Sequence, residues 1–175
     1  MEKITISKDF KGRIFFTSDT HWRHGNIIKY CDRPFVNVQE MDHALIQNWN
    51  KVVSKEDIVF HLGDFAFADK SKWRQIANSL NGTKYLVQGN HDRTDDIPTE
   101  CFEMIRDMLQ IAIYDEELED YSTFIMSHYP LATWAGISRS ICNLHGHIHS
   151  TPDLNGTGFD IVIAKNAPWN QYDVG

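Results

Sequence analysis

The sequence predicts one domain of the α/β class, built of helices packed on layered β-sheet. Two observations carry this prediction. Strand-like and helix-like segments alternate twice between residues 13 and 92, an order typical of layered α/β domains. In addition, several apolar strands end in Gly, Asp, Asn or His, as strands do where such a sheet presents chemistry at its carboxyl edge. With 175 residues, 42% of them hydrophobic, the chain can bury one core over residues 1–175.

The first half of the chain supplies most of these elements. Runs of apolar, aromatic and β-branched residues predict strands, and apolar residues spaced on one face predict helices. The expected strands are residues 4–6 at a sheet edge, 13–18, 57–62 and 84–88. The expected helices are residues 38–52, with Val52 on the apolar face and His43 on the surface, and 71–80, with Ser71 as the cap; residues 22–38 are expected to be a loop.

The second half has a different pattern. Residues 104–115 and 121–127 are expected to be strands joined by the acidic turn 116–120, which is a solvated connection. A His-rich segment, 142–149, and a last strand, 158–163, follow. The residues from 164 onward carry no clear signal.

The net charge, the cysteine count and the apolar segments argue against several classes of function. The net charge of -7 and the pI of about 5.6 disfavour stable nucleic-acid binding, although bound cations could reverse the sign locally. Three cysteines without close spacing indicate neither a disulfide framework nor a Cys zinc site. No apolar signal segment or membrane span is present in the sequence, so we expect a cytoplasmic protein with no membrane partner.

Histidine is abundant, with nine residues, and most lie in short clusters with Asp, Asn or Gly. Taken singly, each cluster has an ordinary alternative: Asp19 could cap a helix, and Gly89-Asn90 could be a hairpin turn. Together there are too many potential ligands for one zinc ion, and two divalent ions sharing a carboxylate would use them all. Mixed Asp, Asn and His ligands suit Mn, Fe, Zn or Ni better than Ca or Mg. The clusters are Asp19/His21, Asp64, Asn90/His91, His128 and His147/His149.

This set of motifs resembles the calcineurin-like metallophosphoesterases. Asp-x-His, Gly-Asp, Gly-Asn-His-Asp, a lone His and Gly-His-x-His occur in the family's order between Asp19 and His149. The longer strings at residues 18–21, 61–65 and 128–131 look like the small bacterial and phage members. The chain departs from the family pattern after residues 158–160, so the role of the tail is open.

The resemblance implies a four-layer α/β/β/α sandwich of two mixed sheets and a role for each motif. Asp19, His21 and His149 would hold one metal ion, Asn90, His128 and His147 a second, and Asp64 would bridge both. A hydroxide between the ions would attack phosphorus in line. His91 would protonate the leaving oxygen, and Asp92 would orient His91. Mn²⁺ is the first choice for both ions, with Fe, Zn or Ni as alternatives.

The expected activity is therefore hydrolysis of a phosphomonoester or phosphodiester, with a small ester or a nucleotide as the substrate. Two alternatives remain: a catalytically idle interaction scaffold with this fold, and a nuclease for short nucleic acid. His24 and Arg33 are candidates for binding the substrate phosphate. Trp22, Tyr129 and Trp134 could stack on a substrate ring, but packing is the favoured interpretation. The sequence leaves the native metals, the oligomeric state and the choice between monoester and diester open.

Overall fold

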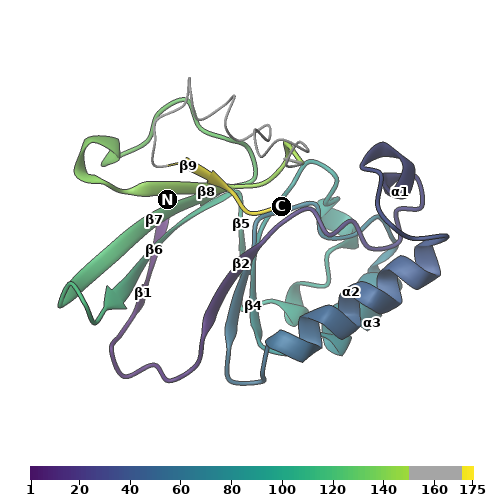
Figure 1. The fold of residues 1–175 in the computed structure, drawn as a ribbon, viewed down its shortest axis with the longest axis horizontal. Helices are drawn as coiled ribbons and strands as arrows, with labels where there is room; N and C mark the ends of the chain where they lie inside the picture. The colour runs from purple at the N-terminus through teal and green to yellow at the C-terminus, as the bar shows by residue number, and fades with distance from the viewer. Residues whose placement is uncertain (150–170) are drawn as a thin grey trace.

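Two β-sheets lie face to face, and the helices lie on the side of the four-stranded sheet (Figure 1). The computed structural model describes residues 1–149 and 171–175. The four-stranded sheet is parallel throughout, in the order β2-β3-β4-β5, where β2 is Ile14–Thr17, β3 is Ile58–His61, β4 is Thr83–Val87 and β5 is Met104–Arg106.

The five-stranded sheet is mixed. Its order is β1-β6-β7-β8-β9, and only β6 and β7 run antiparallel to each other. The edge position expected for the first strand is confirmed. The strands are β1 (Glu2–Ile6), β6 (Met108–Asp115), β7 (Asp120–Ser127), β8 (Cys142–His145) and β9 (Gln171–Asp173).

Alternation along the central strand β3 builds the two apolar layers. Ile58 and Phe60 point into the layer between the sheets, whereas Val59 points into the layer under the helices. All four residues of β3 are buried, as is usual for a parallel strand covered on both faces. The two-sheet α/β architecture is therefore confirmed, with one sheet parallel rather than mixed.

The long helix α2 (Val38–Val52) has the predicted bounds. The Asn37 side chain accepts a hydrogen bond from the Glu40 amide and caps its start. Trp49 is buried and His43 is exposed as expected, and Val52 is half exposed but lines the same hollow as Leu45 and Trp49 of the apolar face.

Helix α3 (Lys70–Ser79) begins one residue earlier than predicted. Its cap is Asp69 rather than Ser71, because Asp69 is extended and its carboxylate accepts from the Lys72 amide. The segment expected to be only a loop contains one helical turn, α1 (Ile27–Tyr30). Short 3₁₀ turns are η1 (Thr94–Asp96), η2 (Thr99–Cys101) and η3 (Ile137–Arg139).

The prediction of one strand over residues 104–115 is wrong. The chain breaks at Asp107, so that β5 pairs with β4 in one sheet and β6 pairs with β1 and β7 in the other. The expected strand 158–163 lies outside the described residues, and strand β9 was not predicted.

The outer face of the five-stranded sheet carries a loop within the described part of the chain. The Leu131 amide donates to Asn143 Oδ1 at 3.2 Å, and Trp134 is buried. Among residues 1–149 and 171–175, no helix is long and apolar enough to cross a membrane.

Candidate metal centre

The polar clusters predicted from the sequence lie where strands of both sheets end. Those in the four-stranded sheet follow the carboxyl ends of β2, β3 and β4, and those in the five-stranded sheet follow β7 and β8. Backbone hydrogen bonds tie the loops together: the Asp19 amide donates to Gly63 O at 2.9 Å, and the Gly146 amide donates to His128 O at 3.0 Å. Segments far apart in the sequence therefore form one continuous rim.

The backbone around these residues is unusual. On an extended chain, residues two apart such as Asp19 and His21 would point the same way, but the structure has left-handed turns there. Residues with a Cβ rarely adopt a positive φ, so the backbone is strained at the candidate site. The positive φ values include Asp19 (53°), His21 (51°), Asp64 (54°), His147 (73°) and His149 (47°).

Two glycines make this geometry accessible. Gly63 has a φ of 96°, which a residue with a side chain would resist. A Cβ on Gly89 would collide with the backbone nitrogen and the Oδ1 atom of Asp64. The loops after β3 and β4 can therefore approach each other only because both positions are glycine.

The first cluster of possible metal ligands, called group one here, consists of Asp19, His21 and His149. The Nε2 atoms of the two histidines are 3.2 Å apart, and His149 Nε2 lies 3.5 Å from Asp19 Oδ1. Asp19 Oδ2 accepts a hydrogen bond from the His147 amide, whereas the buried Oδ1 has no hydrogen-bond partner among the described residues. A buried carboxylate oxygen facing two imidazole nitrogens fits a bound cation.

The second cluster, group two, consists of Asp64, His128 and His147, with Asn90 beside it. His128 Nδ1 lies 2.8 Å from the Leu62 carbonyl oxygen, so it carries the proton, and Nε2 presents a lone pair. That lone pair faces two oxygens, Asn90 Oδ1 at 2.9 Å and Asp64 Oδ2 at 3.5 Å. Such a convergence of acceptors is repulsive unless a cation lies among them.

Asp64 Oδ2 connects the two groups. It lies 3.5 Å from His21 Nε2 on one side and 3.5 Å from His128 Nε2 on the other. The residues present therefore fit a pair of divalent ions on either side of one carboxylate.

Burial favours the neutral forms of two members of group one, Asp19 and His21. It raises the pKa of Asp19, and burial together with the neighbouring His149 lowers the pKa of His21 to about 2. A neutral imidazole is the form that binds metal ions.

His91, the expected proton donor, is exposed at the edge of this centre. Its amide donates to Asp64 Oδ1 at 2.9 Å, and its ring centroid lies 5.6 Å from that of His21. The ring is thus close to the candidate ligands while its outer face remains accessible.

The role predicted for Asp92 needs correction. Its carboxylate accepts hydrogen bonds from the amides of Asp64, Phe65 and Gly89, all at 2.8 to 2.9 Å, and among the described residues no hydrogen bond joins it to His91. Asp92 therefore clamps the Asp64 loop against the Gly89 loop. Burial raises its pKa to about 6, even though the three amides oppose this effect.

The two residues predicted to bind phosphate differ in their surroundings. The Arg33 guanidinium donates to the carbonyl oxygens of Asp19 (2.6 Å) and Thr20 (2.8 Å), so it holds the strained Asp19 turn. His24 lies beside His91, with ring centroids 6.2 Å apart, and its buried Nδ1 has no hydrogen-bond partner within the described chain. His24 thus remains a candidate for substrate contact.

The aromatic residues near the centre also differ in their surroundings: some are buried and others are exposed. Trp22 and Trp134 are buried, as the packing interpretation expects. Tyr129 is 50% exposed, and its ring centroid lies 4.4 Å from that of His147 in group two. Phe67, which the sequence reasoning did not consider, is 54% exposed and lies 4.9 Å from the His24 ring. No signal in the sequence distinguishes it from a core phenylalanine.

Comparisons with known proteins agree with this geometry. A model described as calcineurin-like phosphoesterase matches residues 12–172. The chain is 49% identical over 83 residues to Uncharacterized protein MJ1445 of Methanocaldococcus jannaschii; this match covers 46% of the chain and 47% of that protein, so the chain spans about half the length of this relative.

Two further relatives cover more of the chain. Gene 66 protein of Mycobacterium phage D29 is 26% identical over an alignment of 159 residues, and the match covers 78% of each protein. The crystal structure of AQ665, a protein of unknown function from Aquifex aeolicus, superimposes with a TM-score of 0.61 at 29% identity over 80% of this chain and 81% of that one. The second comparison supports the fold described above.

Proposed function

The chain belongs to the calcineurin-like phosphoesterase family, and from that premise we propose that it hydrolyses phosphate esters with the help of two divalent metal ions. The observation that carries the proposal is the position of Asp64 Oδ2, which lies 3.5 Å from a histidine nitrogen of each group. Group one would hold one ion, and group two with Asn90 would hold the other. When bound, such ions neutralise charge on the phosphoryl oxygens and acidify a water molecule.

The protein's own residues would prepare this reaction in three ways. The Leu62 carbonyl fixes the His128 tautomer, so that Nε2 points to the second ion. Asp92 holds the amides on both sides of the Asp64 turn and thereby fixes the shared carboxylate. His91 would donate a proton from its ring to the departing ester oxygen, which requires the exposed position that it has.

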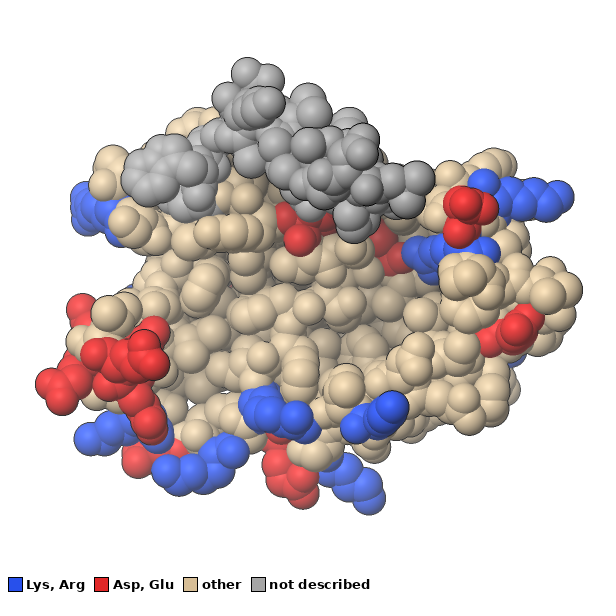
Figure 2. Space-filling model, viewed as in Figure 1, with Lys and Arg blue, Asp and Glu red and all other residues tan. Residues whose placement is uncertain are grey.

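The surface supports a small ester as the substrate rather than duplex nucleic acid. Figure 2 shows that on one face most charged residues lie toward the periphery, that acidic groups also lie in the upper middle, and that the two signs mix along the lower edge. The described residues visible on that face form no continuous basic stripe of the kind that tracks a phosphate backbone. A nucleotide or a short oligonucleotide end remains compatible with this surface.

The test is a paired hydrolysis assay on metal-stripped protein, with and without added Mn²⁺. The substrates are 4-nitrophenyl phosphate and bis(4-nitrophenyl) phosphate, which separate monoesterase from diesterase activity. We expect turnover only with Mn²⁺ and its loss in Asp64→Asn. Asp9→Asn, the same substitution at an exposed aspartate away from the centre, is the matched control and should behave like the wild type.

Bound metal is counted in the same samples. No turnover together with no bound metal would overturn the proposal. Two bound ions without turnover of either ester would favour the idle scaffold.

A further inference from the structure

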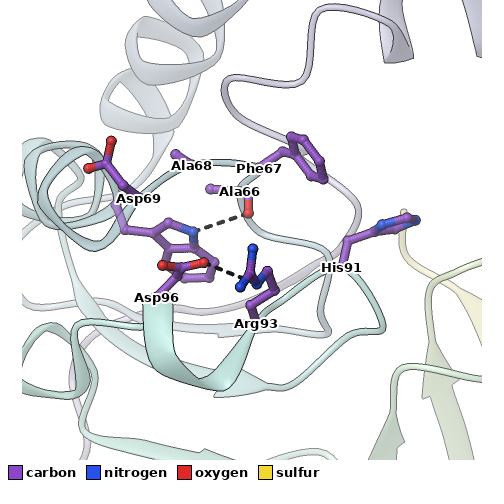
Figure 3. A pocket seen from close by; sticks show the side chains of 8 residues that line it. Ala66, Phe67, Ala68, Asp69, His91, Arg93 and Asp96 are labelled. Atoms are coloured by element: carbon purple, nitrogen blue, oxygen red, sulfur yellow. Dashed lines mark hydrogen bonds and ion pairs between the residues drawn. The ribbon is translucent and has the colours of Figure 1, made fainter.

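A pocket under helix α3 opens beside His91, but none of the candidate metal ligands lines it. Figure 3 shows the His91 ring pointing away from this pocket. Its acidic side chains are already paired, since Asp69 contacts Lys72 and Asp96 contacts Arg93. Supports for the weakly held group one are found instead at the helical turn α1.

The segment from α1 to Arg33 contacts group one at two points. Ile27 is buried and anchors the turn, and Cys31 ends it with an amide hydrogen bond to the Ile27 carbonyl at 3.0 Å. Cys31 Sγ lies 3.4 Å from His149 Nδ1, although the two residues are 118 positions apart in the sequence. Two residues later, the Arg33 guanidinium donates to the Asp19 carbonyl at 2.6 Å. One short segment thus reaches both ends of group one.

The two ring nitrogens of His149 have different surroundings. Nε2 faces the interior of group one, 3.2 Å from His21 Nε2 and 3.5 Å from Asp19 Oδ1. That Asp19 oxygen is buried and has no hydrogen-bond partner in the described chain, which points to a cation at this position. An imidazole that binds a cation through Nε2 carries its proton on Nδ1, so the proton of His149 would face the Cys31 sulfur.

On this basis, and resting on the proposed function, we infer that Cys31 is a positioning residue for the ion of group one. Its sulfur accepts the Nδ1 proton of His149 and thereby keeps the Nε2 lone pair directed at the ion. Cys31 would do for His149 what the Leu62 carbonyl does for His128 in group two. A thiol sulfur is the weaker acceptor of the two, in line with an exposure of 25% for His149 against 1% for His128.

The first test is a calorimetric Mn²⁺ titration, which does not depend on turnover. Cys31→Ala removes the sulfur and should weaken the ion of group one about tenfold while leaving that of group two unchanged. Cys31→Ser restores an acceptor and should recover most of the affinity. Cys101→Ala, the same substitution at a free, half-buried cysteine outside both groups, is the matched control and should bind both ions as the wild type does.

The second test determines the tautomer of His149 in the metal-free protein by NMR of the ring nitrogens, at about pH 8, where an ordinary imidazole is neutral. We expect the proton on Nδ1 in the wild type and in Cys31→Ser, and a mixture of tautomers in Cys31→Ala. A merely structural role of Cys31 would not select one ring nitrogen. The Co²⁺-loaded protein should show no thiolate-to-cobalt charge-transfer band, because Sγ contacts the histidine ring rather than the ion.

Unchanged affinity of group one in Cys31→Ala would overturn the inference, and so would a proton on Nε2 of His149 in the wild type. Loss of both ions in Cys31→Ala would overturn it as well, because Cys31 would then support the whole centre and not one ligand. A charge-transfer band would overturn it by making Cys31 itself a ligand. A wild type that binds no metal would remove the proposed function, whereas the tautomer would still show whether Cys31 orients His149.

Discussion

The two candidate ligand groups on either side of Asp64 are held very differently by the protein. In group two, His128 is 1% exposed, its Nδ1 is fixed on Leu62 O, and its Nε2 lies 2.9 Å from Asn90 Oδ1. In group one, His149 is 25% exposed, and its Nε2 directly faces the Nε2 of His21. Group one also contains the buried Asp19 oxygen without a hydrogen-bond partner in the described chain.

This difference indicates which group of side chains depends on a bound ion for its arrangement. Hydrogen bonds to backbone already orient His128 of group two, so little has to move when an ion binds. In group one, acceptor atoms lie close together with fewer hydrogen bonds to the backbone. A bound ion would relieve the repulsion between these acceptors, but it would also have to order the His149 side chain. We therefore expect group two to bind the tighter of the two ions, and the following predictions test that expectation.

Removing the shared carboxylate should have the largest effect. Asp64→Ala deletes the oxygen that lies 3.5 Å from both His21 and His128, so both ions should be lost together. We expect activity to fall by about 10³-fold or more. Metal analysis and initial rates on the purified variant check this. Retention of one ion at wild-type affinity would show that Asp64 belongs to one group only.

Weakening group one alone should separate the two ions. Asp19→Asn keeps the shape of the side chain but removes its charge, so the ion of group one should be lost and that of group two retained. Activity should fall by about 10²-fold, because one of two charges on the phosphoryl group is missing. Calorimetric Mn²⁺ titration should show two steps in the wild type and only the tighter step in the variant. If the tighter step disappears instead, the order of affinities proposed here is reversed.

His61, which lies next to group one, should also make the stability of the metal-free protein depend on pH. His61 Nε2 lies 2.9 Å from Thr20 Oγ1, between Asp19 and His21 in the sequence, and burial lowers the pKa of His61 to about 3. Because the unfolded chain protonates this histidine near pH 6.5 and the folded chain does not, stability falls as the pH drops below 6.5. Between pH 7 and pH 5 the loss from His61 is about 2 kcal/mol.

The variant that isolates this contribution is His61→Phe. Its free energy of unfolding, measured in urea at both pH values, should change less with pH than that of the wild type. The other buried histidines are common to both proteins and cancel in the difference. Equal pH dependence in the two proteins would show that His61 is protonated alike in the folded and unfolded states.

The parts of this centre that could be predicted are those encoded by residue type. Asp, Asn and His after apolar strands were visible in the sequence, and the order of the motifs separated His147 from His149. The contacts of Arg33 and Asp92 could not be predicted, because their partners are backbone carbonyls and amides, which have no signature in the sequence. The left-handed turn at Asp19 could not be predicted for a related reason, since it depends on hydrogen bonds to a distant loop.

The fold shows the same division between local and long-range information. The continuous apolar run in β3 predicts a strand that is buried on both faces. Neither Gly nor Pro marks the break at Asp107, and a lone Asp is too weak a signal to place it, because the break follows from the pairing of adjacent segments with two different sheets. Strand β9 depends on pairing with β8, which no local pattern indicates.

The smallest predicted effect concerns Arg33, which was expected to bind phosphate. Its guanidinium holds the carbonyls of Asp19 and Thr20, so Arg33→Met should weaken the ion of group one about tenfold and leave that of group two unchanged. Arg23→Met is the matched control, because Arg23 lies in the same loop but pairs with Asp42. Mn²⁺ titration and steady-state kinetics together distinguish the two roles. A higher KM with unchanged metal affinity in Arg33→Met would mean that Arg33 contacts the substrate. Weaker Mn²⁺ binding at group one alone would confirm that Arg33 supports this group through the backbone.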